Sequence, residues 1–366
     1  MRRMVAAPRH YWHWFCLLAV VFCFVVIQMD QFDPGSLTTV ASPVSTPVAA
    51  KSTTLSSRSN TAPREFKCDP ASNSTIPSYL PEAHKDFIRY KHCREFPVLL
   101  SPTPCEEDVH LLLVIKSTAM QIERRAALRE TWGQAGFVQG RRVKLLFLMG
   151  RSKEDVRGYN IEPMLQWENR RHGDILQWDF LDSFFNLTLK ELGFLDWYSE
   201  SCRSAQFVFK GDDDVFVNTH NLLEFLSGHS PNEHLFTGDI IPIAWPIRNR
   251  NRKYFIPVEM FPNGKAYPAY AGGGGYLMSR KTVLGLKEAA KDIELFPIDD
   301  VYTGFCLKKM GVKPRLHPGF RTFGFSHGFK HFDPCIYRDI MLVHKLNPVE
   351  MWTMWALVND QNFICK

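Results

Sequence analysis

Short signatures of nucleotide and metal binding are largely missing from this sequence of 366 residues. Its cysteines form no CxxC pair, which argues against a zinc finger or ribbon. No P-loop and no GxGxxG segment is present, so the two common glycine-rich phosphate cradles are excluded. The acidic run Asp212–Asp214 lacks the glycine that an EF-hand calcium loop needs at its sixth position. A bound nucleotide or metal would therefore need a site of another kind.

Concentrated positive charge is also scarce. The formal net charge is +6, from 44 Lys and Arg against 38 Asp and Glu. Three of these basic residues, Arg2, Arg3 and Arg9, lie at the N-terminus, which leaves a net charge of +3 for the rest of the chain. The one long basic run there is RNRNRK at 248–253. Because nucleic-acid binding depends on a dense cationic surface, we predict no nucleic-acid partner.

The N-terminal region carries a long apolar segment, residues 11–29, with no formal charge. As a helix it would be about 28 Å long, enough to cross the hydrocarbon core of a bilayer. Arginines precede it while Asp30 and Asp33 follow it, so the positive-inside rule predicts a cytosolic tail over 1–10 and a lumenal remainder. A cleaved signal peptide is the alternative, but the stretch is long for one and no small-residue cleavage site follows closely.

Residues 30–65 are rich in Ser, Thr, Pro and Ala and predict an extended stem, because they offer little apolar surface to bury. The lumenal domain would then cover 66–366. Two sequons, at Asn73 and Asn186, predict N-glycosylation and fit the same compartment. An oxidising lumen favours disulfides, and an odd number of cysteines leaves at least one thiol free or paired with another chain: Cys68, Cys93, Cys105, Cys202, Cys306, Cys335 and Cys365.

From about 109 to 211 short apolar runs alternate with longer amphipathic ones. VHLLLVIKS, RRVKLLFLMG, DILQWDF and FVFKGDDD are typical of buried strands, and the segments between them are typical of helices. Strands that alternate with helices predict an α/β fold with a mostly parallel sheet covered on both faces. In such sheets ligands collect at the carboxyl ends of the strands.

The acidic run Asp212–Asp214 follows one of these predicted strands. Buried carboxylates without partners cost several kcal/mol each, so we expect positive groups to meet them. All-oxygen ligands beside a crevice would suit Mn²⁺ or Mg²⁺, with a diphosphate completing the shell. An acidic surface turn without a metal is the alternative. The glycine run at 272–275 predicts a flexible approach to a ligand rather than the start of a phosphate-binding helix.

A second acidic pair, Asp299 and Asp300, precedes a segment with a helical pattern, VYTGFCLKK. The pair is therefore predicted at a helix N-terminus. One interpretation is a helix cap in a favourable dipole. The other is a general base directed into the same cleft.

Six segments taken together resemble a known family: ERRAALRETWG, GDILQWDFLDSFFNLTLK, FVFKGDDDVFVN, YPAYAGGGGYLMSR, FPIDDVYTGFCLKKMG and FDPCIYRDIMLVHKLNP. In this order they resemble the inverting β-1,3-glycosyltransferases, and in particular the β-1,3-N-acetylglucosaminyltransferases. The resemblance runs from about Cys68 to Cys365. It implies a type II Golgi membrane protein with a GT-A fold that uses UDP-sugars and Mn²⁺.

The resemblance also implies site residues. Asp214 and His344 would be direct metal ligands, and Asp212 would support the metal and the nucleotide. Asp300 would be the catalytic base, with Asp299 helping to place a sugar. The implied donor-binding residues are Arg125, Arg129, Asp182, Lys190, Asp212, Asp213, Gly273, Gly274 and Gly275.

The implied reaction is direct displacement at the anomeric carbon of UDP-N-acetylglucosamine by the 3-hydroxyl of a terminal galactose, with inversion. Related galactosyl enzymes usually carry ED where this chain has Asp299 and Asp300, so the IDD form favours N-acetylglucosamine as the donor sugar. A β-1,3-galactosyltransferase and a lumenal sugar-binding protein without turnover are the alternatives. A homo-oligomer, or a hetero-oligomer with other glycosyltransferases, is a further hypothesis. The acceptor glycan is left open.

Overall fold

A computed structural model describes residues 68–71, 76–152, 161–325 and 332–365. They belong to one unit that covers Pro63–Lys366. The predicted tail, anchor and stem, and the sequon at Asn73, lie outside the described residues, so these remain predictions. Within the described ranges, no helix is both long and apolar enough to cross a membrane.

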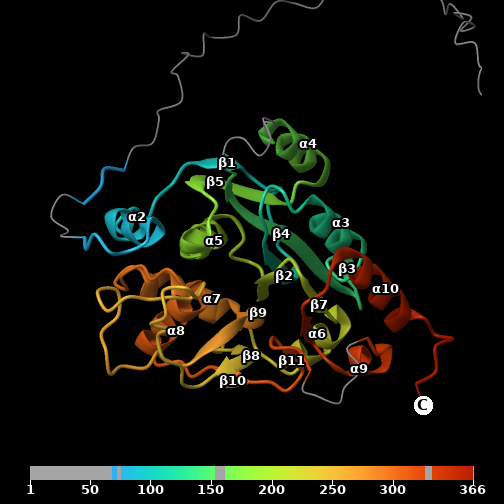
Figure 1. Ribbon diagram of the computed structural model, residues 1–366. Coiled ribbons are helices and arrows are strands. Elements are labelled where there is room, and N and C mark those ends of the chain that lie inside the picture. The colour runs from blue at the N-terminus through green and yellow to red at the C-terminus, as the bar shows by residue number, and fades with distance from the viewer. Residues whose placement is uncertain (1–67, 72–75, 153–160, 326–331, 366) are drawn as a thin grey trace, which may run out of the picture. The chain divides into compact units, whose positions relative to one another are not determined.

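A central sheet runs through the domain in the strand order β1-β5-β4-β2-β6-β9-β8-β10, with β3 paired to β4 (Figure 1). Four of its strands are parallel neighbours and confirm the strands expected from the apolar runs. They are β2 (Val109–Lys116), β4 (Arg141–Arg151), β5 (Ile175–Leu181) and β6 (Phe207–Asp212).

Most of the other pairings are antiparallel, so the sheet is mixed rather than mostly parallel as expected. β9 inserts between β6 and β8 and is antiparallel to both. β1 is antiparallel to β5, β3 is antiparallel to β4, and only β10 is parallel to its neighbour β8. The bounds are β1 Val98–Leu100, β3 Gly136–Val138, β8 Phe236–Ile241, β9 Tyr270–Ser279 and β10 Arg315–Leu316.

The glycine run at 272–275 lies inside β9 and is not a flexible approach segment. It was missed as a strand because glycine is a poor strand former. Its neighbours explain why glycine is needed. A Cβ on Gly275, whose φ is +156°, would lie 2.6 Å from the Phe209 ring. A Cβ on Gly211 in β6 would lie 2.7 Å from the carbonyl oxygen of Gly274.

Helices cover both faces of the sheet (Figure 1). Side chains alternate along β2, so Leu112 and Val114 join one hydrophobic core while Leu111 and Leu113 join the other. The first core lies under α2 (Glu82–Tyr90), η1 (Phe184–Asn186), α5 (Leu187–Ser201), α7 (Arg280–Ala290) and α8 (Asp299–Met310). The second lies under α3 (Ile122–Glu130), α4 (Glu162–His172), α6 (Thr219–Leu226), α9 (Pro334–Asp339) and α10 (Pro348–Asn359).

A second, small sheet has the order β11-β12-β7. In it β7 (Val215–Val217), which follows the acidic run, pairs antiparallel with β12 (Leu342–His344). β11 (Phe320–Arg321) is parallel to β12. In the register His344 lies opposite Val215, so this pairing carries the histidine to the residue next to Asp214.

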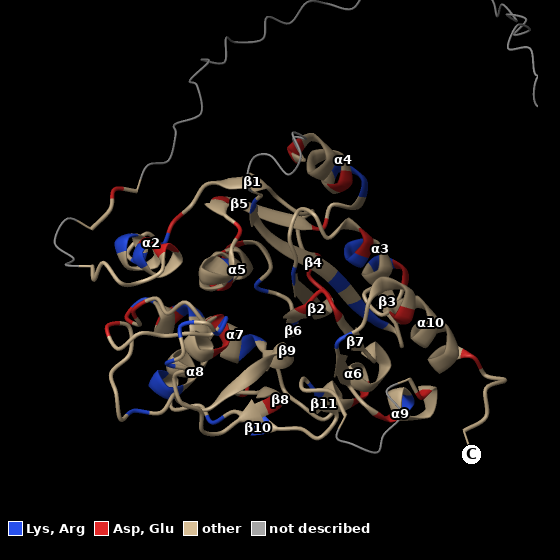
Figure 2. Cartoon of the chain, viewed as in Figure 1, with Lys and Arg blue, Asp and Glu red and all other residues tan. Residues whose placement is uncertain are grey.

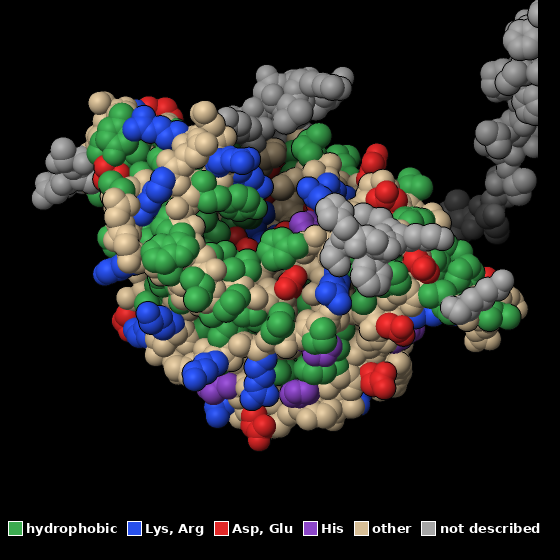
Figure 3. Space-filling model, turned by 60° about the horizontal axis from the view of Figure 1, so that its bottom comes forward, with side chains coloured by type: hydrophobic (Ala, Val, Ile, Leu, Met, Phe, Trp, Pro, Cys, Tyr) green, Lys and Arg blue, Asp and Glu red, His purple; other side chains and the backbone are tan. Residues whose placement is uncertain are grey.

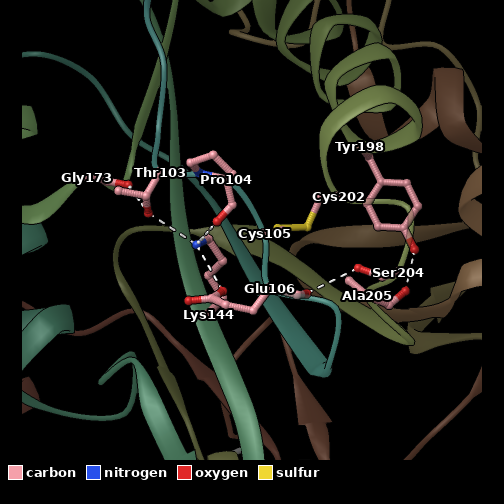
Figure 4. Close-up of a disulfide and its surroundings, with 10 residues drawn as sticks. All are labelled: Thr103, Pro104, Cys105, Glu106, Lys144, Gly173, Tyr198, Cys202, Ser204 and Ala205. Carbon is pink, nitrogen blue, oxygen red and sulfur yellow. Dashed lines mark hydrogen bonds and ion pairs between the residues drawn. A yellow bond between two sulfur atoms is a disulfide. The ribbon is translucent and has the colours of Figure 1, made fainter.

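Three disulfides join Cys68 to Cys93, Cys105 to Cys202 and Cys335 to Cys365. Cys306 is free and buried, which agrees with the odd cysteine count. Figure 4 shows the second disulfide, which ties the segment before β2 to the end of α5. Nearby, Lys144 Nζ donates to the carbonyl oxygen of Pro104 at 2.9 Å. These links secure the end of the sheet where β2 and β6 begin, away from the acidic run where β6 ends.

Candidate active site

The acidic run forms the turn between β6 and β7, near the centre of the domain (Figure 2). β6 ends at Asp212, so the run stands at the carboxyl end of a central strand, as the sequence predicts. Asp213 and Asp214 are buried, and Asp212 is only partly exposed. The expected positive groups are therefore required, and they come from three separate elements.

Arg124 in α3 meets two of these carboxylates. Its Nη1 donates to Asp213 Oδ1 at 2.7 Å and lies 3.3 Å from Asp214 Oδ2. Asp213 also accepts a hydrogen bond from the Ser117 hydroxyl at 2.7 Å. Burial nevertheless raises the pKa of Asp213 above its ordinary value, although both donors oppose that shift. The sequence analysis did not predict Arg124 as a site residue. It predicted Arg125 and Arg129, from the same helix, as donor-binding residues.

His344 meets Asp214 from the other side. Its Nε2 lies 3.2 Å from Asp214 Oδ1, and its Nδ1 lies 3.0 Å from the carbonyl oxygen of Thr322. If Nδ1 donates to that carbonyl, the neutral ring presents an Nε2 lone pair to the carboxylate. Two lone pairs repel, so a cation or a proton has to lie between them. With a proton there, the hydrogen bond to Asp214 raises the pKa of His344.

This arrangement fits a divalent metal. Asp212, Asp214 and His344 each offer one ligand atom, and these atoms lie within 4.8 Å of one another. Burial opposes ionisation of Asp214, but the hydrogen bond from His344 and the nearby cations lower its pKa overall. Two carboxylates and one imidazole are a donor set that suits a divalent metal ion. The structure thus brings together the three residues predicted as the metal site.

Lys116, at the end of β2, connects this cluster to the second acidic pair. Its buried Nζ lies 2.7 Å from Asp299 Oδ2 and 3.1 Å from Asp212 Oδ1. Burial disfavours the ammonium ion, but these carboxylates outweigh burial and raise the pKa of Lys116 well above its ordinary value. In return Lys116, together with Lys210, lowers the pKa of Asp299 against the opposing effect of its burial. Sequence reasoning missed Lys116, whose only signal was a charge at the end of an apolar strand.

Asp300 has a different environment from Asp299. Both lie in the first turn of α8, but the residue at the N-cap is Ile298, and no side chain caps this helix. Asp300 Oδ1 is enclosed and has no hydrogen-bond partner within the described residues. Burial, followed by the charge of Asp299, raises the pKa of Asp300 to about 8. Once it is ionised, a carboxylate in this environment accepts a proton more readily than an ordinary aspartate does.

The glycine strand makes room for this carboxyl. A Cβ on Gly273 would lie 2.8 Å from Asp300 Oδ2. A Cβ on Gly274 would lie 3.1 Å from Thr322, whose carbonyl oxygen orients His344. β9 therefore lies between Asp300, the predicted base, and His344, the predicted metal ligand.

Arg125 and Arg129 do not lie on a solvated face of α3. Arg125 is fully buried and donates from Nε and Nη2 to both carboxylate oxygens of Glu168, each at 2.7 Å. It also donates to the carbonyl oxygen of Thr118 at 2.6 Å. Arg129 pairs with Glu168 and Asp174. These contacts orient the loop after β2. Through the position of that loop, Arg125 would affect a bound nucleotide indirectly. Direct donor binding by either arginine stays a prediction.

Asp182 and Lys190 form a buried ion pair at 2.9 Å. Lys190 Nζ also donates to the carbonyl oxygen of Ser117 at 2.7 Å, while Asp182 accepts from the backbone N–H of Gly150 at 3.0 Å. The pair therefore supports the same loop as Arg125 and lies behind Asp213. Nearby, Asn186 in η1 donates from Nδ2 to the carbonyl oxygen of Leu181 at 2.8 Å. Its predicted glycosylation stays a prediction.

The chain is similar to a known protein family and to several named relatives. The sequence profile of a family described as "Galactosyltransferase" matches residues 123–318. The chain belongs to this family of β-1,3-glycosyltransferases. It is 50% identical over 309 residues to human "N-acetyllactosaminide beta-1,3-N-acetylglucosaminyltransferase 4", covering 83% of this chain and 79% of that relative.

Two further relatives have similar names. Rat "UDP-GlcNAc:betaGal beta-1,3-N-acetylglucosaminyltransferase 7" is 50% identical over 290 residues, covering 77% of this chain and 72% of its own. Human "N-acetyllactosaminide beta-1,3-N-acetylglucosaminyltransferase 3" is 46% identical over 290 residues, covering 78% of each chain. The family expected from the six sequence segments is thus confirmed.

The contrast between the two aspartates of this transferase predicts opposite effects on stability. Asp300 stays protonated in the folded protein up to its pKa of about 8, whereas in the unfolded chain it ionises near pH 4. Wild-type stability should therefore fall across that interval because of this group. Asp300→Asn cannot ionise, so its melting temperature should rise relative to wild type from about pH 4 to about pH 8 and then stay level. Calorimetry in EDTA measures this difference.

The control is Asp299→Asn, which makes the same side-chain change at the neighbouring position. Asp299 has a lowered pKa and pairs with buried Lys116, so its stabilising effect is present above about pH 4 and is lost as the pH falls through its folded pKa. Asp299→Asn should therefore melt below wild type at neutral pH. Shifts of the same sign for both variants would show that the two environments are not distinct.

Proposed function

We propose that this chain is an inverting β-1,3-N-acetylglucosaminyltransferase of the GT-A fold. It transfers N-acetylglucosamine from UDP-N-acetylglucosamine to the 3-hydroxyl of a galactose at the end of a glycan. The observation that carries the proposal is the enclosed Asp300 Oδ1, which lacks a hydrogen-bond partner within the described residues. Its neighbour Asp299 is joined through Lys116 to Asp212, which belongs to the cluster of candidate metal ligands. The names of relatives at 46–50% identity support the sugar and the linkage.

Asp214, His344 and Asp212 would hold Mn²⁺ in this enzyme. When bound, the ion supplies positive charge that stabilises the departing diphosphate. Arg124 and Lys345 keep further positive charge at Asp214, with Lys345 Nζ 3.6 Å from its Oδ2. Asp213 holds Arg124 in place from the buried side.

Asp300 accepts the proton of the galactose 3-hydroxyl as its oxygen attacks the anomeric carbon. The new carbon–oxygen bond forms while the bond to UDP breaks on the opposite face, so an α-linked donor gives a β-linked product. The charge of Asp299, maintained by Lys116, keeps the proton affinity of Asp300 high. General base catalysis of this kind contributes about 10² to 10⁴ in rate.

Two variants separate binding from chemistry. Asp300→Asn should keep the rise in melting temperature on adding UDP and Mn²⁺, because the metal ligands are intact. Its transfer to a galactose-terminated acceptor should fall by about 10² to 10⁴. Asp214→Asn should lose both the Mn²⁺-dependent thermal shift and transfer, since a ligand is removed. Full transfer by Asp300→Asn, or a retained metal shift in Asp214→Asn, would overturn the respective assignment.

A β-1,3-galactosyltransferase is the second candidate, favoured by the description of the matching family. Assaying purified protein with UDP-N-acetylglucosamine and UDP-galactose in parallel, on one galactose-terminated acceptor, decides between them. We expect N-acetylglucosamine transfer to exceed galactose transfer by at least about tenfold, since closely related sugars differ in contacts worth about 1–3 kcal/mol. The reverse preference would establish the galactosyl enzyme, and no transfer from either donor would favour a sugar-binding protein.

The chain would act as a single-pass type II protein of the Golgi membrane, with its catalytic domain in the lumen. The apolar segment 11–29 and its flanking charges support this topology, and the disulfides fit an oxidising compartment. In intact microsomes, protease should leave everything past about residue 30 protected. Removal of the domain by protease without detergent would contradict the topology, and a secreted form starting near Gln31 would support a cleaved signal peptide.

A further inference from the structure

The disulfide between Cys68 and Cys93 has a histidine ring at both of its sulfur atoms. Cys93 follows the turn after α2, and the bond closes a sequence separation of 25 residues. His92 Nε2 lies 3.6 Å from Cys68 Sγ and 3.8 Å from Cys93 Sγ. Among the described residues, neither of the other two disulfides has a hydrogen bond to a histidine ring. Cys365 Sγ instead lies 3.6 Å from Nη1 of Arg338, a cation.

The spacing of these atoms matches a tetrahedral metal site. Zinc binds cysteine sulfur at about 2.3 Å and histidine nitrogen at about 2.0–2.1 Å, which places these two ligand atoms about 3.6 Å apart. The observed distances from nitrogen to sulfur are 3.6 and 3.8 Å. The same geometry needs the two sulfurs about 3.8 Å apart, and van der Waals contact separates two unbonded sulfurs by about that distance. Only the S–S bond itself therefore prevents the three side chains from holding an ion.

The backbone next to the disulfide offers a further oxygen. His92 Nε2 lies 3.0 Å from the carbonyl oxygen of Asp69. Because a carbonyl oxygen only accepts, Nε2 carries the ring proton in the disulfide form and donates it there. In the other neutral tautomer the proton is on Nδ1, and the Nε2 lone pair is available to a metal. The three side chains each offer one ligand atom, and these atoms lie within 4.8 Å of one another.

A cavity gives access to the cluster. Cys68 and Cys93 both line a hollow of about 710 Å³, whose other walls come from α2, the end of β5 and η1. Acidic side chains outnumber Lys91, the one Lys or Arg in this lining, so the charge of the cavity does not oppose an incoming metal ion. Cys93 is buried, whereas Cys68 is partly exposed and His92 is exposed. A small reductant can therefore attack the Cys68 sulfur.

We propose that Cys68, His92 and Cys93 form a zinc site when their disulfide is reduced. A dithiol supplies two electrons and two protons, so the S–S bond breaks to give two thiols while the dithiol closes its own disulfide. Zn²⁺ then displaces both thiol protons into solvent, and the ring proton of His92 moves from Nε2 to Nδ1 so that Nε2 binds. Water or the Asp69 carbonyl oxygen completes four ligands. The ion would thus keep residue 68 joined to the end of α2, independently of the proposed transfer reaction.

The test uses the full chain in detergent, with Co²⁺ as a spectroscopic probe for Zn²⁺. A water-soluble phosphine, which becomes its oxide, opens the disulfide, and alkylation followed by peptide mass spectrometry identifies the reduced cysteines. Reduced wild type should bind Co²⁺ with a thiolate-to-cobalt charge-transfer absorption, and Zn²⁺ should remove this absorption by displacement. The oxidised protein should show none. If the reduced protein shows no such absorption, the proposal is wrong.

The absorption separates this site from metal bound elsewhere. Figure 3 shows a recess in which acidic and histidine side chains are visible among Lys, Arg and hydrophobic ones, and Co²⁺ can also bind at such groups. The cluster of Asp212, Asp214 and His344 contains no sulfur, so Co²⁺ held there gives no thiolate absorption. Failure of the proposed transferase function would therefore leave this measurement unaffected.

Two pairs of substitutions identify the thiolates. The variant Cys68→Ser, Cys93→Ser should lose the absorption. The matched control, Cys335→Ser, Cys365→Ser, removes another disulfide and should keep it. Absorption that persists in the first variant, or disappears only in the second, would assign the thiolates to other cysteines and overturn the site.

The histidine is tested without changing any cysteine, so the disulfide can still form during folding. His92→Gln should weaken Co²⁺ binding to the reduced protein by at least about tenfold, since even the loss of an outer partner of a metal ligand costs about 10- to 100-fold. His172→Gln, at an exposed position at the end of α4, is the matched control and should keep the wild-type affinity. Equal affinity of His92→Gln and wild type would show that the imidazole is not a ligand and would reject the site.

Discussion

Lys116 is the group on which the arrangement of the acidic centre depends. It ends a strand that is buried along most of its length, and it lies between the carboxylates of Asp212 and Asp299, which belong to segments far apart in the sequence. A buried ammonium ion needs such partners, and buried carboxylates need such an ammonium ion. The metal cluster and the N-terminus of α8 are therefore held at one fixed separation. Removing either carboxylate changes the charge state of the other groups around Lys116.

The small sheet completes the centre from the opposite side. β7 follows the acidic run directly, and its pairing with β12 sets His344 beside Asp214. The Thr322 carbonyl then sets the ring orientation through Nδ1. A second layer of contacts from Arg125 and Lys190 converges on the loop at 117–119, which supports Asp213. Residues that were predicted to touch the donor thus also position other residues, and their contact with the donor stays a prediction.

Local pattern in the sequence predicts much of the fold, and the reason is physical. β2, β4, β5 and β6 are continuous apolar runs because both of their faces are buried. β9 was missed because its four glycines have no apolar pattern, and they are needed only where Asp300, Thr322 and the Phe209 ring approach the backbone. The antiparallel pairings with β6 and β8 followed from that one strand, while the short strands β1 and β3 add two more at the other end of the sheet. The acidic run was a candidate metal site from its place at the end of a strand, whereas His344 came from the family resemblance, since no local pattern links it to Asp214.

The sequence alone could not show that Asp299 and Asp300 differ in role, because both are aspartates. Asp299 faces Lys116 and Lys210, which favour its ionised form, whereas Asp300 packs against Gly273 with an enclosed oxygen. The ionised neighbour then adds a negative charge that makes ionisation of Asp300 harder still. Two carboxyl groups with pKa values driven apart can serve as a fixed anion and a proton acceptor in one site. The lysine that stabilises the first aspartate therefore also sets the basicity of the second.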